Sequence, residues 1–381
     1  MTYTNKLKQE LSLHLNLNAD IYFHYKGRVS LYAILKAMGV GAGDEVIIPA
    51  FTCVVVPNAI KYLVAKPIYV DINEDTYNIN LNNLDGLVND RTKVIICQNT
   101  FGLSSNLEDL KTFATKHNLY TIEDCTHGFG GYYNGIPNGL SCDAAFYSMQ
   151  WNKPFSSGIG GFCIVNNNSL KSKVTEVNLD LIPVPFKNKA LLKGQYFAYR
   201  YFLNKYTYWS LISFYRLLSK MNIVVGSSSG EEISGVTMPE DFFMAYSEVQ
   251  AKEGLRNIKK LNGLLLLRKK NAKIYTDFLK NKGKKYVDES LFENHSFLKY
   301  PFLVKDRKSF LEKAVNAKIE LGEWFLSPIH PIESNFEFWN LDIDKYPISK
   351  RVSSQMLNLP TDIEDISRVL KFIEDNLDDI L

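Results

Sequence analysis

The sequence predicts an α/β fold built on a mainly parallel sheet. Apolar, strand-like runs alternate with helix-like runs: strand 45–48, helix 54–63, strand 67–70, strand 93–102, helix 107–116 and strand 120–124. Strands that alternate with helices form βαβ units, whose parallel sheets are covered by helices on both faces. The last of these strands ends at Asp124, a position at which such folds display chemistry.

Length and composition limit the class of protein. The 381 residues, 46% of them hydrophobic, can bury a sizeable core and fit one large domain, alone or with a smaller lobe. The formal net charge of +3 gives no sign of nucleic-acid binding. No run approaches the roughly 20 apolar residues of a membrane span, and the N-terminal stretch lacks the apolar centre of a signal peptide.

The five cysteines lie mostly in or beside apolar strands, with no CxxC spacing. This pattern favours reduced thiols in a cytoplasmic protein, and it disfavours a disulfide framework or a metal site.

The first long helix is expected within 27–43, where Leu31, Ile34 and Met38 share one face and three glycines follow. Its start combines free backbone donors, the positive end of the helix dipole and a guanidinium. Gly27, Arg28 and Val29 are therefore a candidate phosphate cradle. The alternative is a solvated first turn.

The stretch 120–165 carries the strongest candidate chemistry, because Asp124 ends a buried strand and Lys153 stands alone on a turn beside glycines. A lysine amine whose pKa is lowered by burial or by a nearby cation attacks carbonyls and forms Schiff bases. An aspartate aimed at the same point would keep a pyridine nitrogen protonated, as pyridoxal phosphate requires. The alternative is a solvated lysine and a helix-capping aspartate.

The segments IEDCTHGFGGYYNGIPNG and FYSMQWNKPFSSGIGG resemble motifs of the DegT/DnrJ/StrS family of sugar aminotransferases. Gly160 and Gly161 stand seven and eight positions after Lys153, as in the family. The resemblance implies a fold-type I, aspartate aminotransferase-like structure that uses pyridoxal 5'-phosphate and has a mainly parallel seven-stranded sheet. It also implies a large domain over 1–240, a linking helix and small domain over 241–381, and a homodimer with its site between subunits.

The resemblance also assigns roles to single residues. Lys153 would hold the cofactor covalently, Asp124 would pair with the pyridine nitrogen, His127 would lie near the cofactor hydroxyl and Ser148 would bond the phosphate. Cys53 stands where the family places a ring that stacks on the cofactor. Either Phe51 or another aromatic residue covers the cofactor ring, or the stacking on that ring is thinner here, or Cys53 simply fills a gap in the core.

The phosphate side of the site departs from the family pattern. Arg28 stands in place of a threonine, and Phe243-Met244-Ala245 replaces an Asn-x-Arg whose asparagine reaches the neighbouring subunit's cofactor. Arg28 is our candidate for supplying the missing donors.

The segment 183–222 is atypical for the family, with seven lysines or arginines, no acidic residue and many aromatic residues. Such a segment is compatible with peripheral contact to an anionic membrane, or with a subunit interface. A flexible loop is expected over 227–235, and a long amphipathic helix is expected from Pro239 onward.

The C-terminal part is expected to hold a strand over 297–304 and a helix over 306–317. His330 and Trp324 lie near a loop that approaches the substrate in relatives, and Trp151 lies two residues before Lys153. His330 and Trp151 are candidate substrate contacts, although His330 could instead pack at an interface.

By resemblance, the chain transfers an amino group, usually from glutamate, to a keto sugar carried on a nucleotide, for an amino sugar of a surface glycan. The acceptor could instead be lipid-linked or a carbonyl compound that is not a sugar. A sister group that dehydrates sugars has histidine in place of the lysine, so Lys153 argues against dehydration. A regulatory protein that kept the fold without turnover is the remaining alternative.

Overall fold

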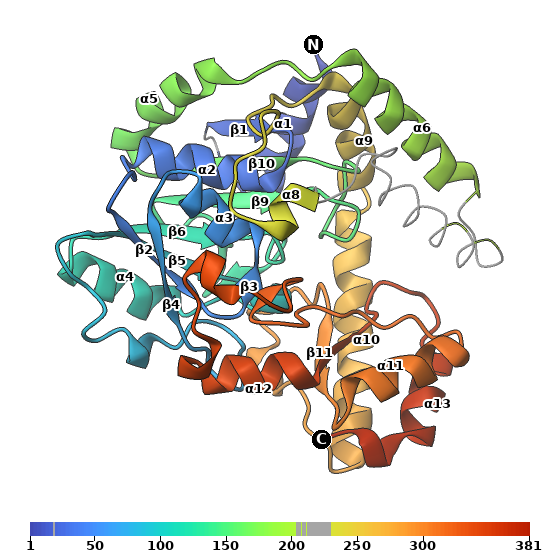
Figure 1. Ribbon diagram of the computed structural model, residues 1–381. Coiled ribbons are helices and arrows are strands. Elements are labelled where there is room, and N and C mark those ends of the chain that lie inside the picture. The colour runs from blue at the N-terminus through green and yellow to red at the C-terminus, as the bar shows by residue number, and fades with distance from the viewer. Residues whose placement is uncertain (18–19, 203–206, 208–210, 212–229) are drawn as a thin grey trace.

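A computed structural model describes residues 1–17, 20–202, 207, 211 and 230–381 (Figure 1). Its centre is a seven-stranded sheet with the order β1-β10-β9-β6-β5-β2-β4. The strands are β1 (Ile21–His24), β2 (Glu45–Pro49), β4 (Lys66–Val70), β5 (Thr92–Gln98), β6 (Tyr120–Asp124), β9 (Ala144–Ser148) and β10 (Gly161–Val165). The four pairings from β9 to β4 are parallel, and the two at the β1 edge are antiparallel. The expected mainly parallel seven-stranded sheet is confirmed.

Helices cover both faces of this sheet, as alternating strand residues require. Val46 and Ile48 face the core formed with α2 (Gly27–Ala37), whereas Ile47 faces the core formed with α4 (Leu107–Lys116). The remaining covering helices are α3 (Val55–Lys61) and α5 (Asn168–Val177) on the α2 side, and α1 (Tyr3–His14) and α9 (Glu248–Ile258) on the other.

The expected single helix from Pro239 is wrong in its start and its continuity. Residues near Met244 are extended and pair with Ile182, so the helix begins only at α9, where Ser247 and Gln250 form a capping box. The helix is interrupted after Ile258 and resumes as α10 (Leu261–Asn281).

Other boundaries also differ from the sequence-based expectation. The strand expected over 93–102 stops at Gln98, because a 3-10 turn follows over Thr100–Gly102. The strand expected over 297–304 is only β11 (Tyr300–Leu303). Within the loop expected over 227–235, residues Gly230–Ser234 form the short helix α8, and 227–229 lie outside the described residues.

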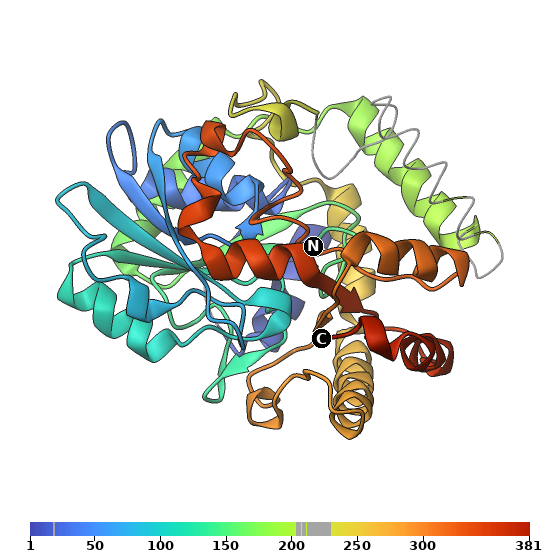
Figure 2. The ribbon, with the colours of Figure 1, turned by 60° about the horizontal axis from the view of Figure 1, so that its bottom comes forward.

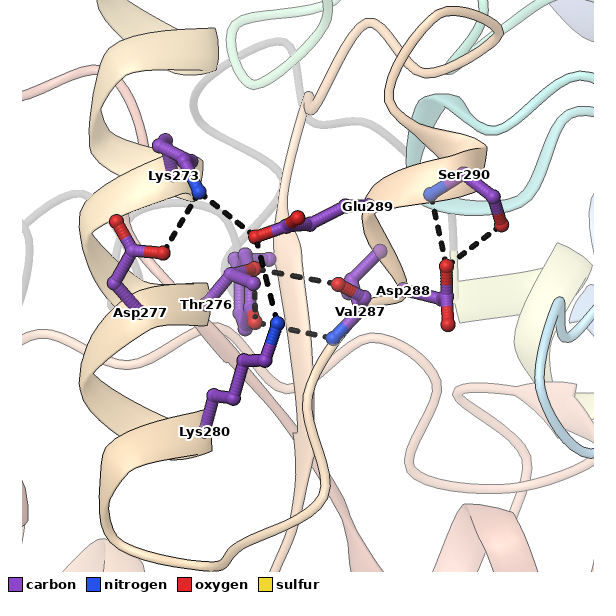
Figure 3. Close-up of polar contacts among 9 residues, drawn as sticks. Lys273, Thr276, Asp277, Lys280, Val287, Asp288, Glu289 and Ser290 are labelled. Atoms are coloured by element: carbon purple, nitrogen blue, oxygen red, sulfur yellow. Dashed lines mark hydrogen bonds and ion pairs between the residues drawn. The ribbon is translucent and has the colours of Figure 1, made fainter.

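The small lobe packs on α10. It contains β11 paired with β13 (Met356–Leu359), together with α11 (Arg307–Asn316) and α13 (Ser367–Asp375). Figure 3 shows polar contacts at the end of α10: Lys273 lies 2.8 Å from Asp277 on the same helix and 2.8 Å from Glu289 on the chain that follows it. These exposed pairs contribute little, so the buried apolar side chains of the lobe dominate its stability.

The chain then returns to the large domain. Strand β12 (Ile329–His330) pairs in parallel with β3 (Thr52–Cys53), and the Asp71 carboxylate accepts a 2.8 Å hydrogen bond from the backbone of Ser349 at the start of α12 (Pro347–Gln355). Figure 2 shows α12 lying across the large domain. This return places His330 beside Cys53, although the two are far apart in sequence.

One helix, α6 (Phe186–Phe202), lies outside the layers that cover the sheet and runs beside α9 (Figure 1). Within the atypical segment 183–222, the structure describes α6, the three residues before it (183–185) and the single residues 207 and 211 after it. Among the described residues, no helix is both long and apolar enough to cross a lipid bilayer.

Candidate active site

Lys153 lies on the loop between β9 and β10, at the C-terminal edge of the parallel strands. Its side chain is half-buried, and burial lowers the pKa of its amine to about 8 against the opposing influence of Cys53 and Asp124. Arg28 and Lys299 lower this pKa further. An amine with this pKa is neutral in a useful fraction of molecules near neutral pH, which a nucleophilic lysine requires.

The loop that carries Lys153 is held by side chains from outside it. Four of its backbone carbonyls accept hydrogen bonds: Pro154 from Arg268, Ser156 from Asn257, Ser157 from Tyr196 and Ile159 from Gln250. Three of these donors stand on α9 or α10, and Tyr196 stands on α6. The loop therefore has a defined conformation although it contains no helix or strand.

Asp124 ends β6 and is buried beside the same loop. Burial raises the pKa of its carboxyl, while hydrogen bonds from Thr126 and the positive charge of Lys153 oppose the rise. The backbone N–H of Thr126 donates to Oδ1 at 2.9 Å. A buried carboxylate near a cation and with few local donors is suited to pairing with a further cationic group.

His127 stands three residues after Asp124 and lies close to the charge of Lys153. Its Nδ1 accepts a 3.3 Å hydrogen bond from the backbone N–H of Phe101, and burial lowers its pKa well below the usual value. The ring is therefore neutral with its proton on Nε2, which leaves that nitrogen as a donor. This is the role that a contact to the cofactor hydroxyl requires.

Trp324 covers His127 and Lys153. Its ring stacks on the His127 ring with centroids 4.7 Å apart and planes 8° apart, and Lys153 Nζ lies 4.5 Å from the indole centroid. Phe51 does not cover the site, because it is fully buried against Phe101 and Phe325. Of the aromatic residues that could replace the ring absent at Cys53, the structure therefore places Trp324 at the site and not Phe51.

Cys53 lies at the site but is small and half-buried. Burial raises the pKa of its thiol, and the positive charges of Arg28 and Lys153 oppose that rise, so both cations are close by. His330 pairs with Cys53 between β12 and β3, and its Nδ1 accepts a 3.3 Å hydrogen bond from the Leu326 N–H. Burial and the charge of Lys153 lower the pKa of His330 to about 4.

The predicted phosphate cradle is formed by three backbone segments that approach closely. A Cβ on Gly161 would lie 2.3 Å from the Gly27 Cα, and a Cβ on Gly27 would lie 3.1 Å from the Ser148 Cβ. Only glycine fits at both positions. Ser148 at the end of β9 therefore lies beside the start of α2, where Val29 is buried and its N–H bonds to the Lys26 carbonyl.

Glu232 was not anticipated at this cradle. Its buried carboxylate, on α8, forms an ion pair with the Arg28 guanidinium and lies 3.8 Å from the Lys26 amine. No sequence motif pointed to it, because α8 follows a segment without recognisable family pattern. The start of α2 thus holds two cations, Lys26 and Arg28, and one carboxylate, Glu232. The two cations suit an anion when the carboxylate moves away or when their positive charge exceeds its negative charge.

Trp151 points toward α6. Its ring contacts Tyr196 and Tyr199, with centroids 5.8 Å and 4.7 Å away. The structure therefore brings together Lys153, Asp124, His127, Cys53, His330 and the cradle at Gly27, Arg28, Val29 and Ser148, whereas Trp151 packs on the atypical helix. An aldehyde-reactive amine, a buried carboxylate and a cationic cradle fit a phosphorylated pyridine aldehyde.

A model of the DegT/DnrJ/EryC1/StrS aminotransferase family matches residues 25–202 and 241–373. The chain belongs to this family. The resemblance on which the fold and cofactor were predicted is confirmed, and members of the family use pyridoxal 5'-phosphate. The family match ends at 202 and resumes at 241, so the first half of the atypical segment (183–202) lies inside the match and the second half (203–222) lies between its two parts.

Individual proteins similar to this chain agree with its membership of the family. GDP-perosamine synthase from Escherichia coli O157:H7 is 35% identical over 38% of this chain and 40% of its own length. A pleiotropic regulatory protein from Geobacillus stearothermophilus is 34% identical over 45% of this chain and 46% of its own length. These alignments thus span less than half of each curated relative. A putative sugar aminotransferase from Streptococcus pneumoniae, solved in its PMP form, shares the fold, with a TM-score of 0.73, 20% identity and coverage of 98% of this chain and 90% of its own.

Proposed function

We propose that this chain transfers an amino group from an amino acid, with L-glutamate as the expected donor, to a keto sugar carried on a nucleotide. The product would be an amino sugar for a surface glycan. The observation that carries the proposal is the convergence of the Lys153 amine, the buried Asp124 carboxylate and the neutral His127 ring at one edge of the sheet. A relative named GDP-perosamine synthase supports the choice of a nucleotide-linked sugar.

The chain's own residues would divide the work as follows. Lys153 Nζ would hold the cofactor, and its lowered pKa would suit it to accept and return a proton there. Asp124 keeps the proton on the pyridine nitrogen, and His127 donates from Nε2 to the cofactor hydroxyl. Arg28, Ser148 and the backbone at Gly27 would hold the phosphate, whereas the Val29 N–H already donates to the Lys26 carbonyl. When bound, pyridoxal phosphate would supply the electron sink for the reaction.

The decisive test compares wild type with Lys153→Ala. We expect purified wild type to show a visible absorption band that glutamate bleaches, and Lys153→Ala to lack that band. An unchanged band in the variant would contradict the role of Lys153. Incubating the glutamate-treated protein with a panel of nucleotide-linked keto sugars should restore the band only with the true acceptor. Recovery with a lipid-linked or non-sugar carbonyl compound would instead identify that substrate class.

We further propose that the active form is a cytoplasmic homodimer. The proposal rests on membership of the family, in which the site lies between subunits, although Phe243-Met244-Ala245 replaces the family's Asn-x-Arg that crosses to the neighbour. Light scattering at the concentrations used for assay should give twice the 43.6 kDa mass of the chain. Full activity in a species of single-chain mass would overturn this part of the proposal.

A peripheral membrane contact through 183–222 is proposed for the described part, α6. Phe186, Phe197 and Tyr201 are exposed along this helix beside Lys187 and Lys193. Residues 203–206, 208–210 and 212–222 of the segment lie outside the described residues. Flotation with liposomes should depend on anionic lipid and fall with added salt. Indifference to both would favour a subunit interface for this face.

A regulatory role without turnover is the second candidate, because one relative is named a pleiotropic regulatory protein. The geometry of Lys153, Asp124 and His127 favours the enzyme. A regulator would keep the visible band but fail to bleach with any amino donor, so the same spectra separate the two functions.

A further inference from the structure

The helix α6 packs on the loop that carries Lys153. The inward residues of α6, Leu192 and Tyr196, are buried in a cluster that includes Ile159 of that loop, and Trp151 packs against the same cluster. A 2.8 Å ion pair between Arg200 and Glu253 also fastens α6 to α9. The atypical segment is therefore attached to the catalytic side of the large domain along one face of this helix.

The contacts between α6 and the loop lie on both sides of Lys153. Before the lysine, the Trp151 ring packs edge-on against Tyr196 at 5.8 Å and lies 4.7 Å from the Tyr199 ring. After the lysine, the Tyr196 hydroxyl donates a 2.7 Å hydrogen bond to the Ser157 carbonyl. One side chain of α6 thus touches the loop two residues before Lys153 and four residues after it.

The residue after Ser157 shows how tightly this contact is built. Gly158 has a φ of +77°, and a Cβ there would lie 2.3 Å from Tyr196 Cε1 and 3.1 Å from Trp151 Cζ2. The loop backbone therefore runs directly against both rings, and a side chain at Gly158 would push them away.

We propose that Tyr196 is a positioning residue for Lys153: the hydroxyl and ring of Tyr196 hold the loop on both sides of Lys153 and so keep the amine beneath the Trp324 ring. This inference rests on the proposed role of Lys153 in holding the cofactor. It assigns a function to the described part of the atypical segment, which forms one wall of the lysine loop. Tyr196 touches neither cofactor nor substrate in this proposal.

The physical reason is the dependence of the lysine on burial. Burial is the largest influence on the Lys153 amine, and it lowers its pKa to about 8. A loop released from α6 would admit water to the amine, and hydration of the charged form would return the pKa toward its usual value. Fewer amines would then be neutral at pH 7.

The test compares Tyr196→Phe, which removes only the hydroxyl, with Tyr199→Phe as the matched control. Tyr199 stands on the same helix and contacts Trp151, but within the described chain its hydroxyl has no hydrogen bond to the loop. The rate at which each apoprotein takes up pyridoxal 5'-phosphate is measured from pH 6 to 10, which gives the apparent pKa of the reacting amine. Thermal unfolding is recorded in parallel.

For Tyr196→Phe we expect the apparent pKa to rise by about 0.5 or more and uptake at pH 7 to slow by roughly 3-fold to 10-fold, with Tyr199→Phe unchanged. A wild-type pH profile in Tyr196→Phe overturns the proposal, whether or not its unfolding temperature falls. If Tyr196→Phe does not fold, Trp151→Phe tests the other contact with the same expected shift, and an unchanged profile there overturns the proposal equally. Lys153→Ala separates the proposal for Tyr196 from the proposed role of Lys153. Cofactor uptake that persists with the same spectrum in that variant contradicts the role of Lys153 itself.

Discussion

The Nζ atom of Lys153 lies 4.5 Å from the centroid of the Trp324 ring, and the same ring stacks on His127. Trp324 belongs to the C-terminal part of the chain that returns to the large domain. It therefore covers Lys153 and His127, which lie on loops of the large domain. This contact gives the site an aromatic ring although Cys53 stands where the family has one. The cation–π contact favours the charged amine, whereas burial favours the neutral one.

Trp324→Ala should weaken cofactor retention, and Trp324→Phe should largely preserve it. An aromatic contact of this kind contributes about 1 kcal/mol, so we expect the apparent dissociation constant for pyridoxal 5'-phosphate to rise on the order of 5-fold in the alanine variant. Absorbance titration of the apoprotein measures it. Equal affinities in the two variants would show that the indole does not support the cofactor.

The reactivity of Lys153 should follow a pKa of about 8. Because only the neutral amine attacks an aldehyde, cofactor uptake by the apoprotein should rise about tenfold per pH unit up to pH 8 and level off above it. An ordinary lysine would level off only above pH 10. Stopped-flow absorbance from pH 6 to 11 distinguishes the two, and a plateau beginning above pH 10 would contradict the burial argument.

Asp124→Asn should abolish the half-reaction with glutamate while leaving the cofactor bound. The amide has nearly the same shape as the carboxylate but cannot hold a proton on the pyridine nitrogen, so we expect a loss of roughly a hundredfold or more in the bleaching rate. Single-turnover spectroscopy measures it. Glu123→Gln is a useful neighbouring control, because the Glu123 carboxylate already accepts hydrogen bonds from the Asn99 side chain and the Gly139 N–H. Normal bleaching in Asp124→Asn would remove this residue from the mechanism.

Glu232→Gln should change anion binding at the start of α2. Removing the carboxylate leaves Lys26 and Arg28 with a larger net positive charge, so inorganic phosphate should bind roughly 3-fold to 10-fold more tightly. Without phosphate the variant should unfold at a lower temperature, because a buried cation has lost its acidic partner, and phosphate should restore it.

Calorimetry and thermal unfolding, each with and without phosphate, check this expectation. Glu253→Gln is the matched control, because it also removes an acidic partner of an arginine, Arg200, away from the cradle. Phosphate affinity that responds equally in both variants would mean that the cradle does not bind the anion.

Local pattern and family motif were sufficient for most of the sheet and for naming Lys153 and Asp124 as candidate residues. The strand ending at Asp124 and the helix over 107–116 both lie where they were expected. The helix expected from Pro239 failed because pairing of Met244 with Ile182 keeps that stretch extended. A long-range pairing of this kind leaves no trace in the local periodicity.

The sequence by itself determined the α/β class, the family and its cofactor, and it named Lys153 and Asp124 as candidate residues. Only the tertiary structure decided what surrounds them. Trp324 reaches Lys153, Glu232 reaches Arg28 and Tyr196 reaches Ser157 across long stretches of chain. The physical reason is that burial, pKa and stacking depend on neighbours in space, and those neighbours come from segments whose own residues form ordinary helices and loops.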